Sequence, residues 1–230
     1  LQVPEFSDRH RTLIFENRGV GKSEDPGGPF TTADLADDLV GLLDALALER
    51  VDMLGVFMGG MTAQEFAIRH PDRLGRLILT GTYARPDAKR RLLLHTWQTL
   101  ARAGAGPEVF LGERLLWTLQ DETLEQSDLI EAMAASFPGD SPPITADILI
   151  RQCDACLGHD SFDRLREIQH PTLILCGRQD QLTPPQLHRE LADEIPNSRL
   201  VTLGYGAHLV LAESAERFNH TVLQFLAEEP

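Results

Sequence analysis

Short apolar runs alternate with longer amphipathic stretches along this chain, and that alternation constrains its fold more than any other feature. Five continuously apolar runs end in turn residues, at 12–15, 51–54, 77–80, 172–176 and 200–203. Such runs are typical of parallel strands that are covered on both faces. Apolar residues recur at helical spacing over 32–46, 61–69, 184–194 and 214–227. This order predicts an α/β fold, with a mostly parallel sheet flanked by helices.

One segment interrupts the alternation. From residue 85 to residue 166, four helical patterns follow one another without a strand between them. We therefore expect 85–166 to form a helical cap on a core made of 1–84 and 167–230, because the segment leaves from the carboxyl end of a strand, where open α/β sheets bind ligands. Helices that only thicken one face of the sheet are the alternative. Three aromatic residues of the segment either line a pocket or pack the cap on the sheet: Trp97, Phe110 and Trp117.

Composition excludes several classes of partner. The chain has 21 basic and 35 acidic residues, a net charge of −14, which argues against binding to nucleic acid or to an anionic membrane surface. No apolar run approaches the ~18 residues of a spanning helix. The 3 cysteines are not the even set of a secreted disulfide scaffold, and no signal peptide opens the sequence. We expect a cytoplasmic location.

Cysteine and histidine residues offer a weak metal-binding pattern. Cys153 and Cys156 are followed by His159, but they fall on an amphipathic helix and no second ligand pair lies nearby. We expect buried cysteines there, with no metal and no other cofactor. Six further histidines fall in loops or at helix ends and are expected at the surface: His10, His70, His95, His170, His188 and His220.

A glycine-rich turn at 16–23 ends in Gly-Lys-Ser, as a phosphate-binding loop does. Such a loop needs a glycine at the position of Glu16 and a helix directly after the serine. The sequence Asp-Pro-Gly-Gly-Pro at 25–29 prevents that helix. We therefore expect no nucleotide site here.

Five segments carry a resemblance to a known superfamily. They read, in order, FENRGVGKSEDP, FTTADLADDLVGLLDALALERVDMLG, HPDRLGRLILTGT, IQHPTLILCGRQDQLTP and IPNSRLVTLGYGAHLVLAESAERFNHTVLQFL. Together they cover most of the chain outside the expected cap, and they resemble the α/β-hydrolase superfamily. The resemblance implies the sheet and helices of that fold, and an ancestry among capped esterases and lactonases that use a Ser-His-Asp triad.

The resemblance places the nucleophile turn of that superfamily, G-x-S-x-G, at residues 55–59. Gly55 and Gly59 match the pattern, but Phe57 stands at the nucleophile position. A phenyl ring has no lone pair with which to attack a carbonyl carbon and no proton for a base to remove. The backbone N–H of Met58 is the oxyanion donor that the resemblance implies.

The other two triad positions match. The resemblance places the acid at Asp180 and the base at His208. Two interpretations of this pair are open. It is either a relic, kept as a buried hydrogen-bonded pair, or a general base that acts on water or on a ligand.

The resemblance also implies a strand before Leu1 that supplies a second oxyanion donor and lies between 12–15 and 51–54. Its absence would open a gap of roughly 9 to 10 Å in a buried sheet. Either 12–15 closes onto 51–54, or another peptide fills the slot. We expect 51–54 to be central in the sheet, and a complementing N-terminal peptide or a homo-oligomer as a partner.

Two functions follow from these residues. The first is a pseudo-hydrolase that binds a small apolar ligand beneath its cap, or that performs non-hydrolytic chemistry with His208 and Asp180. The second is a carboxylic ester or lactone hydrolase whose nucleophile and N-terminus are altered in this sequence, with an ester-like substrate.

Overall fold

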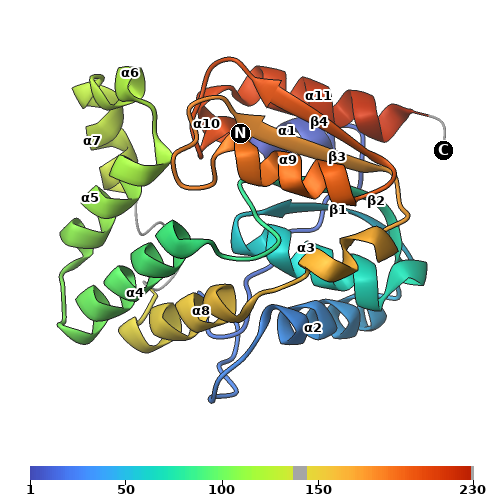
Figure 1. Cartoon of the computed structure of the whole chain (residues 1–230), viewed down its shortest axis with the longest axis horizontal. Coiled ribbons are helices and arrows are strands. Elements are labelled where there is room, and N and C mark those ends of the chain that lie inside the picture. The colour runs from blue at the N-terminus through green and yellow to red at the C-terminus, as the bar shows by residue number, and fades with distance from the viewer. Residues whose placement is uncertain (137–143, 229–230) are drawn as a thin grey trace.

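Four parallel strands form the central sheet of the computed structural model, which describes residues 1–136 and 144–228 (Figure 1). In spatial order they are β1 (Val51–Val56), β2 (Leu74–Thr80), β3 (Thr172–Gly177) and β4 (Ser198–Leu203). Every neighbouring pair is parallel. All carboxyl ends therefore meet at one edge of the sheet, and the predicted parallel α/β class is confirmed.

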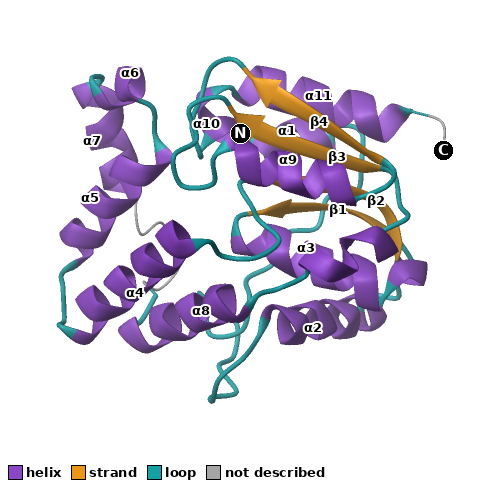
Figure 2. Ribbon diagram, in the orientation of Figure 1, coloured by secondary structure: helices purple, strands orange, loops and turns teal. Residues whose placement is uncertain are grey.

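Helices cover both faces of this sheet (Figure 2). One face packs against α2 (Thr32–Ala45), α3 (Met58–Arg69) and α9 (Pro185–Glu194). The other face packs against α1 (Gln2–Ser7), α10 (Val210–Glu213) and α11 (Ala215–Ala227). Because it is covered on both sides, β3 has all six residues buried. Among the described residues, no helix combines the length and the apolar character that crossing a bilayer requires.

The start of α2 shows how local sequence fixes these helices. Thr31 Oγ1 accepts a hydrogen bond from the Asp34 backbone N–H (3.1 Å), and Asp34 Oδ2 accepts one from the Thr31 N–H (2.7 Å). This capping box satisfies two backbone donors that the first turn would otherwise leave free. Leu35, Leu39 and Leu43 follow at four-residue spacing and are buried on one face.

Consecutive helices occupy the chain between β2 and β3. They are α4 (Ala88–Arg102), α5 (Pro107–Thr118), α6 (Asp121–Leu124), α7 (Ser127–Ser136) and α8 (Ala146–Gly158), followed by the short 3₁₀ helix η2 (Phe162–Glu167) before β3. Another short 3₁₀ helix, η1 (Pro71–Arg73), lies outside this segment and precedes β2. No strand interrupts the described part of this segment. Figure 1 shows α4 to α7 beside the carboxyl ends of the strands. That is where a cap would lie, and the division into core and cap stays a prediction.

The sheet departs from two expectations at its β1 edge. β1 pairs with β2 alone, so in the described sheet it is an edge strand, and the expectation that 51–54 is central was wrong. Residues 12–15 form no strand and do not close onto β1, and Leu13, Ile14 and Phe15 are exposed. A strand must pair its N–H and C=O groups with a neighbour, and 12–15 makes no backbone hydrogen bond with the unpaired edge of β1, so its apolar character alone does not make it a strand. A peptide or a second copy at this edge stays a prediction.

Candidate functional site

A strand-to-helix turn at the end of β1 places Phe57 at its apex. Phe57 has φ 58° and ψ −122°, a backbone conformation that residues with side chains rarely adopt. The turn is tight because Gly55 lets α3 approach the strand: a Cβ on Gly55 would lie 2.6 Å from the Gly59 carbonyl oxygen. A Cβ on Gly59 would meet nothing within 4 Å, so packing in this structure does not require a glycine there.

The Phe57 ring stacks on the ring of His208. The two ring centroids are 4.1 Å apart and the ring planes differ by 17°. Gly81, which follows β2 with φ +61°, makes room for this pair, since a Cβ there would lie 2.7 Å from the Phe57 ring and 3.0 Å from His208 Cε1. The phenyl group therefore occupies the space in front of the imidazole.

Asp180 and His208 meet where β3 and β4 end. His208 Nδ1 lies 2.9 Å from Asp180 Oδ2, and both side chains are almost fully buried. Thr183 adds two donors to this carboxylate: its N–H bonds Oδ1 (2.7 Å) and its Oγ1 bonds Oδ2 (2.7 Å). Burial alone would raise the pKa of Asp180, but His208 and the Thr183 donors hold that pKa below its ordinary value. The carboxylate is therefore ionised and fixes the imidazole orientation.

The loop that carries His208 is attached both to α10 and to the helices inserted between β2 and β3. The Ala207 N–H donates to Glu213 Oε2 (2.6 Å), the Gly206 N–H to Gln120 Oε1 (3.0 Å), and the Leu209 N–H to the Thr118 carbonyl oxygen (2.9 Å). The Gln120 N–H in turn donates to Glu213 Oε1 (3.1 Å). The position of the imidazole therefore depends on the segment between β2 and β3.

A cavity of about 400 Å³ lies between the Phe57 turn, His208 and helices α4, α5 and α8. Its wall is mostly apolar and includes Met61, Leu94, Trp97, Leu115 and Leu149. Of the three aromatic residues for which lining a pocket and packing the cap were both open, Trp97 lines the cavity, whereas Phe110 and Trp117 do not. His208 lines the cavity too, and its Nε2 makes no hydrogen bond with the described residues. The free ring nitrogen of the Asp180–His208 pair is therefore available to a ligand.

Two cysteines also line the cavity. Burial raises the pKa of Cys153 and the pKa of Cys156 to about 12 each, so neither thiol ionises near neutral pH. His159, the third member of the sequence pattern, bonds Thr32 instead. No cluster of three or more potential metal ligands occurs in the part of the chain that the structure describes.

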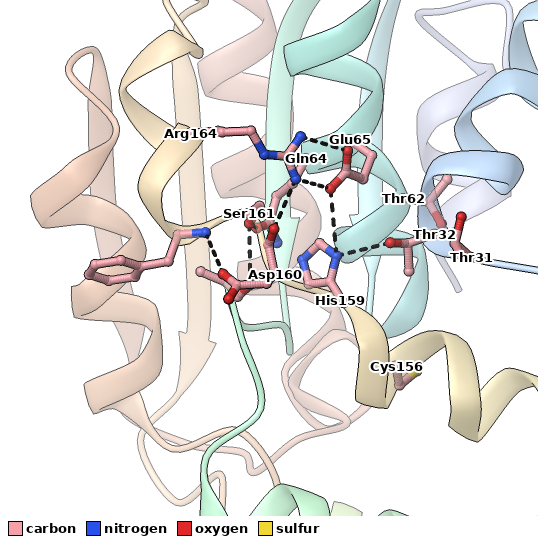
Figure 3. Close-up of polar contacts among 12 residues, drawn as sticks. Thr31, Thr32, Thr62, Gln64, Glu65, Cys156, His159, Asp160, Ser161 and Arg164 are labelled. Atoms are coloured by element: carbon pink, nitrogen blue, oxygen red, sulfur yellow. Dashed lines mark hydrogen bonds and ion pairs between the residues drawn. The ribbon is translucent and has the colours of Figure 1, made fainter.

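A second buried histidine lies outside the cavity, where α8 meets α2 and α3 (Figure 3). His159 Nδ1 is 2.9 Å from Thr32 Oγ1 and 4.0 Å from Glu65 Oε1. Arg164 holds Glu65 with two hydrogen bonds, of 2.6 Å and 3.0 Å. His159 Nε2 is buried without a partner, and burial lowers the pKa of this imidazole to about 4. This polar group has the components of a catalytic site but none of them lines the cavity.

The prediction that His188 lies at the surface was wrong. It is fully buried on the inner face of α9 beside Leu187 and Leu191, and burial lowers its pKa to about 4. The signal was present in the sequence, since His188, Leu191 and Ile195 share helical spacing. The other five histidines named with it are exposed or partly exposed.

Sequence reasoning missed several residues around Asp180 and His208. Thr183 had a local signal, because a threonine three residues after an aspartate in a turn commonly bonds that carboxylate. Gln120 had no such signal, since its contact to Gly206 joins parts of the chain that are 86 residues apart. Glu213 had none either, since it lies in α10 and its partner Ala207 lies in the loop before that helix.

These features place the chain in a family. The protein-family model described as alpha/beta hydrolase fold matches residues 2–215, and the chain belongs to this family. It is 30% identical to "Putative carbamate hydrolase RutD" of Caulobacter sp. (strain K31), over 99% of this chain and 85% of that protein. It is similar to the solved enol-lactonase from Burkholderia xenovorans LB400, with a TM-score of 0.89 and 30% identity over 99% of this chain and 85% of that one. The hydrolase from Pseudomonas aeruginosa PA01 gives a TM-score of 0.88 at 28% identity, over 99% and 83%.

Proposed function

We propose that this chain binds a small, largely apolar molecule in its cavity and forms no covalent acyl intermediate with it. The observation that carries the proposal is Phe57, which stands at the apex of the turn after β1 and stacks on His208. In an acyl-transfer enzyme of this family the side chain at that apex gives its proton to the histidine and attacks the carbonyl. A phenyl ring can do neither.

No other described side chain in the cavity is suited to replace that nucleophile. The two cavity cysteines are held as thiols by their raised pKa values. The Thr183 hydroxyl donates its proton to Asp180, and its oxygen also lies 3.0 Å from His208 Nδ1, the nitrogen that Asp180 already engages. Phe57 and Met58, which follow one another at the turn, are both inert.

The turn also offers a donor to an oxygen atom of a bound molecule. Met58 begins α3, and the first N–H groups of a helix have no acceptor within it, so the Met58 N–H is a suitable donor. Such a donor can orient a bound carbonyl or hydroxyl group without any acyl transfer, because it acts by hydrogen bonding alone.

The Asp180–His208 pair supports a second activity of the same site. The Asp180 carboxylate orients the imidazole of this cavity-lining histidine, and its other ring nitrogen makes no hydrogen bond with a described residue. A histidine held in this way can remove a proton from an acidic O–H or C–H group of a bound molecule, or from water. The similarity to a "Putative carbamate hydrolase" and to an enol-lactonase supports ligands that contain an acyl or enol-ester group.

A panel of short-chain p-nitrophenyl esters tests the proposal. The unchanged chain, Phe57→Ser and Phe57→Ala are compared, and Phe57→Ala is the control for an enlarged cavity without a nucleophile. Activity that appears in Phe57→Ser alone is the expected result. Turnover by the unchanged chain that His208→Gln abolishes would show instead that the pair hydrolyses esters without a side-chain nucleophile, and the binding function would be wrong.

A further inference from the structure

The charges on the cavity wall differ in sign from the charge of the whole chain. The protein carries a net charge of −14, yet none of the described residues that line the cavity is an aspartate or a glutamate. The charged and titratable groups of the wall are instead Arg90, Arg114 and His208, apart from the tyrosine and the cysteines, which are neutral. This wall favours an anion over a neutral molecule or a cation.

The two arginines differ in what they can offer a ligand. Arg90 is buried and already engaged, since its Nε donates to Asp87 Oδ1 (2.8 Å) and its Nη1 donates to the Leu182 carbonyl oxygen (2.7 Å). Arg114 lines the same cavity from α5 and is exposed, and its guanidinium makes no hydrogen bond or ion pair with any described residue. The Arg114 guanidinium is therefore a free cation at the side of the cavity that opens to solvent.

We infer that the cavity takes an amphipathic carboxylate, whose anionic group binds Arg114 and whose apolar body extends along Trp97 and Leu115 toward Phe57. This inference rests on the proposed function, because it names the class of molecule that the apolar cavity binds. A guanidinium pairs with a carboxylate through two parallel hydrogen bonds, which fixes orientation as well as affinity. The apolar end of the ligand then lies against the Phe57 ring, beside His208 Nε2.

Three probes of equal chain length isolate the charge: octanoate, 1-octanol and octylamine. Calorimetric titration of the unchanged chain gives the binding constant of each, at about 20 mM and about 300 mM salt. We expect Arg114→Gln to weaken octanoate about tenfold at low salt, and to change 1-octanol less than about twofold, since a charge-assisted hydrogen bond is lost for the anion alone. Octylamine should bind more weakly than both to the unchanged chain.

Arg102→Gln is the matched control. Arg102 ends α4, is exposed and is not among the residues that line the cavity, so this variant removes the same charge from the same part of the molecule. It should change octanoate affinity less than about twofold. Equal weakening by the Arg102 and Arg114 variants would overturn the inference, because the effect would then come from the general field of the protein.

The remaining outcomes separate this inference from the proposed function. If 1-octanol binds but octanoate does not, or if Arg114→Gln weakens the binding of both equally, the inference of a carboxylate ligand is wrong and the proposed binding of an apolar molecule stands. If none of the three probes binds the unchanged chain, both statements are overturned. A tenfold loss for octanoate alone supports both.

Discussion

Two histidines of this chain lie buried beside a carboxylate and a threonine, yet only one of them lines the cavity. His208 lies 2.9 Å from Asp180 and 3.0 Å from Thr183. His159 lies 2.9 Å from Thr32 and 4.0 Å from Glu65. Nδ1 of each ring is held by protein. His208 lines the cavity and its Nε2 makes no hydrogen bond with a described residue, whereas His159 lies outside the cavity and its Nε2 is buried without a partner. Residue types alone therefore do not define a site.

The carboxylates explain the rest of the difference. Asp180 has no arginine partner among the described residues, and it orients His208. Glu65 is held by Arg164, which neutralises it, so burial dominates at His159 and lowers the pKa of this imidazole. The cluster at His159 is thus suited to joining α8 to α2 and α3, and the pair at His208 is suited to meeting a ligand.

The largest effect is expected from breaking the ion pair in the His159 cluster. Arg164→Ala leaves the Glu65 charge buried without its partner, and we expect the free energy of unfolding to fall by about 3 kcal/mol, the lower end for such pairs because Arg164 is 38% exposed. Urea unfolding measures it. Arg166→Ala is the control, since Arg166 pairs with Glu194 at the surface and should cost less than about 1 kcal/mol. Equal losses would contradict a structural role for Glu65.

The second effect is a loss of folding stability at acid pH, which we expect from the cluster at His159. An imidazole whose folded pKa is about 4, against ~6.5 when unfolded, stays neutral in the folded state while the unfolded state takes up a proton. Its contribution to stability is complete above pH 6.5 and is lost as pH falls toward 4, by up to about 3 kcal/mol. His188 adds a loss of the same sign.

Unfolding curves at pH 7, 6 and 5 check this pH dependence. His159→Gln should reduce the loss of stability between pH 7 and pH 5, and the exposed His220→Gln should leave it unchanged. An unaltered slope in His159→Gln would show that this imidazole is not the group that titrates.

Phe57 should behave as a cavity residue and not as a core residue. It is only partly buried and lines the cavity, so we expect Phe57→Ala to cost about 1 to 2 kcal/mol, below the roughly 3 to 5 kcal/mol of a fully packed phenylalanine. Phe66→Ala in α3, where the ring is fully buried, supplies that full cost. If thermal unfolding shows the same loss for both variants, the site is packed shut and the binding proposal fails.

The smallest difference concerns the two threonines. Thr183 donates to an ionised carboxylate and Thr32 bonds a neutral imidazole, so Thr183→Val should cost about 1 kcal/mol more than Thr32→Val. Thr183→Val should also shift the pH dependence of ligand binding, and Thr32→Val should not. Identical costs would mean that Asp180 is not ionised in the folded protein.

The sequence predicted the parts of this fold that depend on local pattern. The continuous apolar runs at β2 and β3 became buried parallel strands, because helices cover both of their faces. The run at 12–15 is as apolar as these, but it forms no strand, since a strand also needs backbone hydrogen bonds to a neighbour and 12–15 makes none with β1. Because 12–15 does not pair with it, β1 lies at the edge of the described sheet, where a central position was expected.

The site also divides into residues that the sequence predicted and contacts that it did not. Phe57, Asp180 and His208 were placed by motif, and they converge because their strands are parallel and end together. The stacking of Phe57 on His208, the links from Gln120 and Glu213, and the free Arg114 depend on how the inserted helices pack. No sequence spacing encodes those contacts.

Covalent labelling with a fluorophosphonate tests most directly whether the cavity holds a nucleophile. The reagent forms a P–O bond with an activated serine and releases fluoride, so intact mass reports one added phosphonyl group. We predict no mass increase for the unchanged chain, one addition for Phe57→Ser, and none when His208→Ala is combined with Phe57→Ser. A stoichiometric addition to the unchanged chain that His208→Ala abolishes would contradict the account, because the cavity would then contain an activated nucleophile other than residue 57.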